Sequence, residues 1–403
     1  MPEAPEHHDV LIIGGGNAGI SLAARLRNDG LRDVAVVESR PVHRYRPLLN
    51  YVGAGEARMS ELERPAADVL PDGCTSIPGE VVSVDAEGHT VGLASGRSIG
   101  WTTLVVCPGM DEDWDATPGL REAYAAEWAA STFDDDTASG VWPALRELRS
   151  GRVLFTVPPE PAPCGATALK PLFMACDHWQ RTGVLDDLDV HLVLPGPSPL
   201  GLEGPDARLE QVLTAYGITV HRETQVSRLR DGAVTLASRG STDSGPAGER
   251  VLEDVAYAHV VPHYRAPGWV VDSGLAGDHP AGLVDVDPQT LRHRRFPDIW
   301  SLGDVADLRT RPSGGALRKQ AAVLAANIEA VRADGTLEHY DGYTVMPITT
   351  SRHRLMLVEV DRDGRPQPTV PFPDLTRPRA VTWWVDRYVL PQVYWRRILR
   401  GKA

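Results

Sequence analysis

Hydrophobic residues near the N-terminus follow a strand, turn, helix, strand order. Val10 to Ile13 form a continuous apolar run, which is typical of a strand buried on both faces of a parallel sheet. A glycine-rich turn follows, and Ile20 to Leu26 are rich in Ala and Leu, as expected for a helix packed on that sheet. A second apolar run ends at Glu38. This order predicts a βαβ unit at the start of the chain.

Later apolar runs predict that the chain leaves this first lobe, builds a second α/β lobe and returns. The expected elements are a strand at 103–107 ending at Pro108-Gly109, a linker at 111–119, strands at 153–157 and 190–194, a short strand within 290–304 that ends at Gly303-Asp304, and an Ala-rich helix at 321–333. We therefore expect a first lobe at 1–113, a second lobe at 114–265, a return segment at 266–345 and a C-terminal region at 346–403.

The first turn is a complete dinucleotide-binding fingerprint, and its position at the start of the chain points to FAD. Gly14 permits the tight turn, Gly16 lets the backbone approach a pyrophosphate, and Gly19 lets the helix pack on the strand. The pyrophosphate is expected at the helix N-terminus. Glu38 follows about 20 residues further on, where it can bond a ribose 2′-hydroxyl and disfavours a 2′-phosphate.

Composition narrows the class of protein further. A chain of 403 residues exceeds what one core usually holds, and a net charge of −13 makes nucleic acid an unexpected partner. The N-terminus has no secretory pattern and no run of 18 apolar residues occurs, so we expect a cytoplasmic protein. The four cysteines have no metal-ligand spacing, and no metal site is expected. Only three of the 41 basic residues are lysines, a skew typical of high-GC bacteria: Lys170, Lys319 and Lys402.

The pairing of the N-terminal fingerprint with Gly303-Asp304 resembles two-lobed flavoproteins of the glutathione-reductase type. The resemblance implies tandem Rossmann-like lobes, with Asp304 against the ribityl hydroxyls of FAD. In the second lobe, the strand 190–194 is followed by a proline-crowded turn, 195–201, in which the G-x-G-x-x-G spacing fails. A nicotinamide donor is therefore disfavoured, which also opposes a type II NADH dehydrogenase.

The chain resembles the sulfide:quinone oxidoreductases, especially the branch that includes the mitochondrial form. Besides the fingerprint, the resemblance rests on residues 45–55 (YRPLLNYVGAG), 161–166 (PAPCGA), 293–297 (HRRFP) leading to Gly303-Asp304, and 340–343 (YDGY). It implies an FAD-dependent oxidoreductase that oxidises sulfide or a small thiol, with a quinone as acceptor. It also places Cys164 beside the flavin ring, as the thiolate contact or the C4a adduct.

Cys164 has support of its own, and the family's second redox cysteine is missing. Cys164 precedes a helix that begins near 167–171, and a thiol ahead of a helix N-terminus tends toward the thiolate; a buried structural cysteine is the alternative. The second redox position, just after Asp304, is Val305. Since valine can neither open a disulfide nor pass electrons on, the two-cysteine mechanism cannot run unchanged.

The remaining cysteines offer one possible substitute. Cys176 lies 12 residues along a helix from Cys164, on the order of 15 Å away, too far for a disulfide. Cys107 ends a strand in a segment expected near the flavin, although a core cysteine is the alternative there. Cys74 is expected in a surface loop.

The C-terminal segment at 380–400 interleaves aromatic and apolar residues with arginines, including Arg387, Arg396, Arg397 and Arg400. Such a segment suits a bilayer interface, so the sequence leaves open a weak peripheral membrane contact. The alternative is that this segment packs on its own FAD lobe or on the partner in a homodimer.

Three functions therefore stay open: a sulfide:quinone oxidoreductase-like enzyme, a soluble flavoenzyme repurposed for another small metabolite because of Val305, and a flavin-binding protein without turnover. Lys319 is either a residue that stabilises reduced flavin or a solvated lysine.

Overall fold

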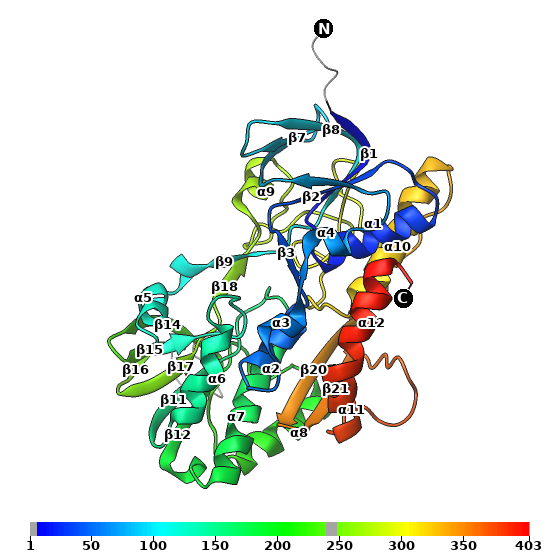
Figure 1. Ribbon diagram of the computed structural model, residues 1–403. Helices are drawn as coiled ribbons and strands as arrows, with labels where there is room; N and C mark the ends of the chain where they lie inside the picture. The colour runs from blue at the N-terminus through cyan, green and yellow to red at the C-terminus, as the bar shows by residue number, and fades with distance from the viewer. Residues whose placement is uncertain (1–5, 239–247, 403) are drawn as a thin grey trace.

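The computed structural model describes residues 6–238 and 248–402 and shows two α/β lobes joined by a C-terminal segment (Figure 1). The N-terminal lobe is a seven-stranded sheet of order β5-β2-β1-β8-β7-β6, with β19 added beside β8. The strands are β1 (His7–Ile13), β2 (Val34–Glu38), β5 (Thr75–Pro78), β6 (Val81–Asp85), β7 (Thr90–Leu93), β8 (Ser98–Val106) and β19 (Ile299–Ser301). β1 pairs in parallel with β2 and β8, so the predicted βαβ unit is confirmed.

The predicted return of the chain is built into this sheet. β19 pairs in parallel with β8, although almost 200 residues separate them in the sequence. The helices α1 (Asn17–Asn28) and α10 (Leu317–Arg332) then pack side by side against the sheet (Figure 1). The N-termini of both helices therefore face the carboxyl ends of the parallel strands, where α/β sheets bind their ligands.

The second lobe has a five-stranded, all-parallel sheet of order β10-β17-β11-β12-β13. Its strands are β10 (Ala129–Ala130), β11 (Gly151–Thr156), β12 (Leu188–Val193), β13 (Thr219–His221) and β17 (Val255–His259), and its helices are α5 (Leu120–Ala125), α6 (Ala138–Glu147), α7 (Leu169–Thr182) and α8 (Glu203–Ala215). A three-stranded antiparallel sheet, β14 (Thr224–Arg230), β15 (Ala233–Ser238) and β16 (Gly248–Leu252), completes it.

Two antiparallel strands carry the chain between the lobes. β9 (Asp111–Asp113) leads out of the first lobe and β18 (His263–Arg265) leads back, paired so that His263 faces Asp113. The stretch 111–119, predicted as a linker, therefore begins as a strand and continues as a 3₁₀ turn at Trp114–Ala116. The polar composition that suggests a linker is explained by the exposure of this narrow ribbon.

An insertion of the first lobe and the C-terminal region bridge the two lobes. The insertion holds β3 (Val42–Arg44), α2 (Leu49–Val52), α3 (Met59–Leu62), β4 (Glu63–Pro65) and α4 (Ala66–Val69), and α9 (Gly268–Asp272) begins the return segment. The C-terminal region holds the hairpin β20 (Thr344–Ser351) and β21 (Arg354–Val360), then α11 (Ala380–Trp384), a π-helical turn (Val385–Val389), α12 (Leu390–Arg396) and a 3₁₀ turn (Ile398–Arg400). Figure 1 shows this last segment running along both lobes.

Candidate active site

The glycine loop has the geometry that its sequence predicts. Gly14 has a φ of 106°, and a Cβ there would collide with the carbonyl oxygen of Cys107. A Cβ on Gly19 would likewise collide with the carbonyl oxygen of Gly14, so the helix lies directly on the turn. Gly16, by contrast, has no atom within 4 Å of a Cβ built on it. The chain is closely packed around two of the glycines and leaves open space beside the third, where a pyrophosphate is expected to approach.

Glu38 lies at the same loop, at the carboxyl end of β2. Its Oε2 accepts the N–H of Gly15 at 2.7 Å, and its Oε1 accepts the N–H of Arg40 at 2.8 Å. Each carboxylate oxygen keeps a second lone pair. The position of Glu38 therefore allows the predicted hydrogen bond to a ribose hydroxyl, which stays a prediction.

The Gly303-Asp304 pair follows β19 and meets the start of α1. A Cβ on Gly303 would lie 3.4 Å from the Cβ of Ala18, and the N–H of Gly303 donates to Gln320 Oε1 at 2.9 Å. Burial raises the pKa of Asp304 to about 6, against the opposing charge of Arg46. Among the described residues, no group hydrogen-bonds its carboxylate. A largely buried acid with free acceptor positions fits a ligand that brings hydroxyl donors, as a ribityl chain does.

Cys164 has a backbone conformation that residues other than glycine rarely adopt. It precedes the 3₁₀ turn Gly165–Ala168 that leads into α7, with φ 53° and ψ 42°, in the left-handed region. Its Sγ accepts the N–H of Gly314 at 3.3 Å, and its own N–H donates to Pro312 O at 3.2 Å. The structure thus brings Cys164, from the second lobe, onto the segment that follows Asp304.

A buried chain of hydrogen bonds secures this turn from the other lobe. The carbonyl oxygen of Cys164 accepts both the N–H of Thr167, at 2.8 Å, and its hydroxyl, at 2.9 Å. The same hydroxyl accepts from Asn50 Nδ2 at 3.3 Å, and Asn50 Oδ1 accepts from the Thr132 hydroxyl at 2.8 Å. Asn50, in α2, belongs to the segment 45–55 that carries part of the family resemblance. The segment 45–55 was singled out for its family resemblance, but Asn50 itself was given no role.

The surroundings of Cys164 favour the neutral thiol, whereas the sequence predicted a thiolate. Burial, followed by the charge of Asp304, raises the pKa of the Cys164 thiol to about 12. The Gly314 N–H and the charge of Lys170 lower it, and the charge of Glu160 raises it. The turn that follows Cys164 is a short 3₁₀ segment, so the favourable dipole of α7 does not outweigh desolvation.

The other cysteines do not join Cys164 in the structure, and all four are free. Cys107 is buried, and its Sγ lies 3.8 Å from the carbonyl oxygen of Gly14. Cys176 lies in the core of the second lobe, and Cys74, expected in a surface loop, is partly buried beside β5. Val305 is fully buried in the core of the first lobe. In residues 6–238 and 248–402, no contact joins another cysteine to Cys164, and a role for Cys107 stays a prediction.

The second lobe places the fingerprint position elsewhere than predicted. The fingerprint position was expected in the turn 195–201 after β12, but the sheet order places β11 at the centre of the sheet, between β17 and β12. A dinucleotide fingerprint would follow β11, where the chain reads PPEPAPC at 158–164. The G-x-G-x-x-G spacing fails there too, and Cys164 ends that loop. The strand order could not be read from the apolar runs, because 153–157 and 190–194 are equally apolar.

A pocket of about 450 Å³ opens between the lobes at this point. It is lined by residues of both loops of the second lobe, of the return segment and of the C-terminal hairpin, among them Glu160, Leu200, Asp304, Arg309, Arg311 and Met346. The Glu160 carboxyl, whose pKa burial raises, lies 3.9 Å from the Arg311 guanidinium. The pocket gives a small molecule access to the loop that carries Cys164.

Comparisons with known proteins agree with this arrangement. The family model described as pyridine nucleotide-disulphide oxidoreductase matches residues 8–139. The mitochondrial sulfide:quinone oxidoreductase of Mus musculus is 27% identical over 99% of this chain and 88% of its own length. The chain belongs to the sulfide:quinone oxidoreductase family. It is an FAD-dependent oxidoreductase, as the residues around Gly14 and Asp304 indicate.

The chain is also similar to a solved structure and to a further curated protein. The sulfide:quinone oxidoreductase from Aquifex aeolicus has the same fold, with a TM-score of 0.82 over 98% of this chain and 92% of that one, at 17% identity. An NADH dehydrogenase-like protein of Mycobacterium tuberculosis is 31% identical over 74% of this chain and 73% of its own length. The two-lobed fold predicted from the sequence is confirmed.

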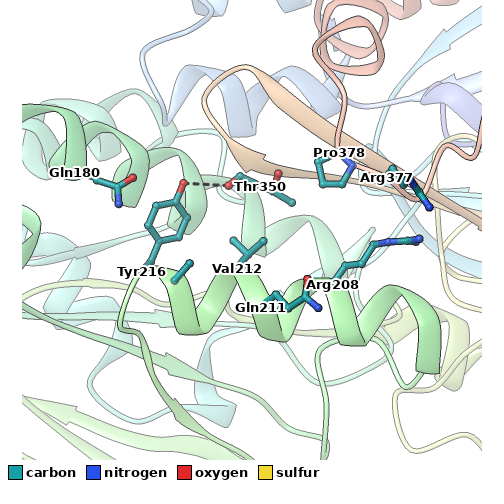
Figure 2. Close-up of a pocket in the computed structure, with 9 residues that line it drawn as sticks. Gln180, Arg208, Gln211, Val212, Tyr216, Thr350, Arg377 and Pro378 are labelled. Atoms are coloured by element: carbon teal, nitrogen blue, oxygen red, sulfur yellow. Dashed lines mark hydrogen bonds between the residues drawn. The ribbon is translucent and has the colours of Figure 1, made fainter.

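A second pocket, of about 570 Å³, is lined by no residue of the short segments that carry the family resemblance (Figure 2). It lies among α7, α8, the end of β20 and residues 377–378, and the Tyr216 hydroxyl donates to Thr350 O there at 3.2 Å. Its two arginines, Arg208 and Arg377, both pair with Asp374. None of its lining residues is a predicted site residue.

The C-terminal segment packs on the FAD lobe. His43 Nδ1–H donates to the carbonyl oxygen of Gly15 at 2.9 Å, and its Nε2 accepts from the Tyr394 hydroxyl at 2.6 Å. Arg387, counted in the sequence as a basic surface residue, is buried and pairs with Glu61 at 2.7 Å. The C-terminal segment therefore packs on its own FAD lobe, which was one of the alternatives expected for it. No helix among residues 6–238 and 248–402 has the length and apolar character needed to span a bilayer.

Proposed function

We propose that the chain oxidises sulfide or another small thiol at Cys164, with a quinone reoxidising the FAD. The supporting observation is the position of the Cys164 sulfur, which contacts the Gly314 N–H and lies within electrostatic reach of Asp304. Bound FAD supplies a two-electron acceptor. The resemblance to the mitochondrial enzymes supplies the substrate class.

The chain's own residues have distinct parts in this proposal. The pyrophosphate and the adenosine ribose of FAD are held by Gly14, Gly16, Gly19 and Glu38. Its ribityl part is held by Gly303 and Asp304. Cys164 would join its sulfur to that of the substrate, a two-electron oxidation whose electrons bound FAD would accept, and the Gly314 N–H stabilises negative charge on the Cys164 sulfur. Burial of the thiol raises its pKa. Lys319 is not needed, because it pairs with Asp341 at the surface at 2.7 Å.

The test is anaerobic mixing of the FAD-loaded protein with sulfide and, separately, with NADH, followed by absorbance near 450 nm, a setting of roughly that value for oxidised flavin. We expect sulfide to bleach the flavin and a water-soluble quinone to restore the colour, while NADH leaves it unchanged. Bleaching by NADH alone would replace the proposal with a dehydrogenase, in line with the NADH dehydrogenase-like relative.

One alternative has specific support, a flavoenzyme that oxidises a larger organic metabolite on the same scaffold. Val305, fully buried, stands where the family has its second redox cysteine, so the two-cysteine mechanism cannot run unchanged. In the same experiment, this alternative predicts that sulfide and NADH both leave the flavin oxidised. Bleaching by a small organic thiol would instead support the first proposal.

The proposal includes a cytoplasmic protein that contacts the inner face of the membrane through its C-terminal segment. Val381, Trp384 and Tyr388 are 61%, 53% and 45% exposed and follow one another at helical spacing. Replacing Trp384 and Tyr388 with serine should lower cosedimentation with anionic phospholipid vesicles about tenfold, because both rings leave the interface. Val271→Ser, an equally exposed apolar residue on α9, should bind like the wild type. Equal binding by all three proteins would rule out this contact.

A further inference from the structure

A buried histidine links the glycine loop to the C-terminal segment. His43, on β3, is 5% exposed, and Tyr394, on α12, is 2% exposed. His43 Nδ1–H donates to the carbonyl oxygen of Gly15 at 2.9 Å, and the Tyr394 hydroxyl lies 2.6 Å from His43 Nε2. Two hydrogen bonds therefore connect the turn that is expected to receive the pyrophosphate of FAD to a helix that lies far from it in the sequence.

The direction of each bond follows from the chemistry of the groups. A carbonyl oxygen can only accept, so His43 carries its proton on Nδ1. Nε2 of the neutral ring is then an acceptor, and the Tyr394 hydroxyl is its donor. Burial lowers the pKa of His43, against the opposing effects of the Gly15 carbonyl and the charge of Glu38, which agrees with a neutral ring. Tyr394 thus holds the ring in the orientation in which Nδ1 faces Gly15.

The C-terminal segment is held against the loop by further contacts. The Tyr394 ring lies 4.4 Å from the Tyr45 ring and 5.8 Å from the His43 ring, between centroids. At the end of α1, Asn28 Nδ2 donates to the carbonyl oxygen of Arg400 at 2.9 Å. The segment therefore reaches both the histidine under the glycine loop and the helix that follows this loop.

The group that His43 holds is the peptide between Gly15 and Gly16. This peptide is trans, and in a planar trans peptide the C=O and the N–H point in opposite directions. Because the Gly15 carbonyl points toward His43, the Gly16 N–H points away from it. Among the described residues, no acceptor takes the Gly16 N–H, and a Cβ on Gly16 would meet no atom within 4 Å. A free N–H beside open space is a donor suited to a phosphate oxygen.

The other polar group of Gly15 is occupied as well. Its N–H donates to Glu38 Oε2 at 2.7 Å, so Glu38 and His43 hold the two sides of the same residue. The peptide plane is therefore fixed before any ligand arrives, and a site that is fixed in advance spends less of its binding energy on ordering.

We propose that His43 and Tyr394 are positioning residues of the FAD site, which fix the Gly15–Gly16 peptide so that the Gly16 N–H is presented to the pyrophosphate. The C-terminal segment is then a part of the FAD site. The proposal rests on the position of the pyrophosphate beside Gly16, as given above, and is independent of the role of Cys164. Without His43, the buried Gly15 carbonyl would lose its partner, and FAD would have to order the peptide as it binds.

The test is the rate at which the loaded protein releases FAD, measured by gel filtration at successive times after dilution. Leucine and asparagine have nearly the same size and shape, but asparagine Nδ2 lies as many bonds from the backbone as histidine Nδ1 and can donate to Gly15. His43→Leu should release FAD about tenfold faster than the wild type, the scale of one unpaired buried carbonyl. His43→Asn keeps the donor without its orientation by Tyr394, so it should release FAD about threefold faster.

Tyr394→Phe removes one hydroxyl and keeps the ring, and it should also release FAD about threefold faster. This mild change decides the test if His43→Leu does not load FAD. Since Tyr394 acts through His43, the double variant H43L/Y394F should release FAD at the rate of His43→Leu alone. The control is Tyr124→Phe, which removes a buried hydroxyl that donates to Val260 O at 2.6 Å in the second lobe and should release FAD like the wild type.

A purely structural reading is that His43 and Tyr394 only fasten the C-terminal segment. It predicts lower unfolding midpoints of the FAD-free variants with FAD release like the wild type, and no rescue by asparagine. Wild-type release by Tyr394→Phe, equal release by His43→Leu and His43→Asn, or faster release by the double variant than by His43→Leu would overturn the proposal.

Release of FAD does not require turnover. The proposed function fails if sulfide does not bleach the flavin, while the role of His43 and Tyr394 fails through the release rates or through wild-type FAD content in Gly16→Ala, which would remove its premise.

Discussion

The Cys164→Ser protein should keep its FAD and lose reduction by sulfide by at least about a thousandfold, the scale on which loss of a nucleophile acts. The serine hydroxyl can still accept the Gly314 N–H, and the backbone bonds to Pro312 and Thr167 do not involve the side chain. The fold and the FAD site should therefore persist. What disappears is the sulfur, because a serine hydroxyl is a far weaker nucleophile at neutral pH.

Stopped-flow absorbance of the variant and the wild type, mixed anaerobically with sulfide, measures this loss. The control is Cys74→Ser, which removes a partly buried thiol beside β5 and should be reduced at the wild-type rate. Fast bleaching of the Cys164→Ser protein would show that sulfide reduces the flavin without this cysteine. The assignment of Cys164 would then be wrong, whatever the other cysteines do.

The second large effect is expected at Gly16, where alanine should leave the fold intact and weaken FAD binding at least about tenfold. Gly16 has extended backbone angles, φ −75° and ψ −166°, which alanine adopts freely. No atom of the chain lies within 4 Å of the new Cβ. The methyl group therefore meets only the ligand that the loop is expected to hold, in contrast to Gly14→Ala, which should disrupt folding as well.

Two measurements separate these effects: the thermal unfolding midpoint and the FAD content after gel filtration. Gly16→Ala should match the wild type in unfolding of the FAD-free protein and fall below it in FAD content. Gly204→Ala, in α8 and equally free of close neighbours, should match the wild type in both. Wild-type FAD content in Gly16→Ala would place the pyrophosphate elsewhere.

The FAD lobe could be predicted from the sequence because its signals are local. Gly14, Gly16, Gly19 and Glu38 lie within 25 consecutive residues, and each has a defined steric role in one turn. The return through Gly303-Asp304 was predictable as well, since an apolar strand ends directly at the pair. Cys164 was assigned from the family resemblance, and its raised pKa was missed because desolvation depends on the other lobe.

The contacts around the C-terminal segment could not be predicted in this way. His43 and Tyr394 lie 351 residues apart, and no periodic pattern relates a histidine in a strand to a tyrosine in a helix. Arg387 was counted with the surface arginines of this segment, but it is buried in the π-helical turn and pairs with Glu61, 326 residues away in the sequence. The order of β11 and β12 was missed because equally apolar strands carry no mark of their place in a sheet.

Cys164 has a left-handed backbone, at φ 53°. A residue with a Cβ pays about 1 kcal/mol or more for that conformation, whereas glycine adopts it freely. Random substitution under selection for stability alone would thus tend toward glycine at this position. The proposed role of Cys164 therefore accounts for a cysteine at a position where glycine should be more stable, and Cys164→Gly should unfold at a higher temperature while losing the proposed sulfur chemistry.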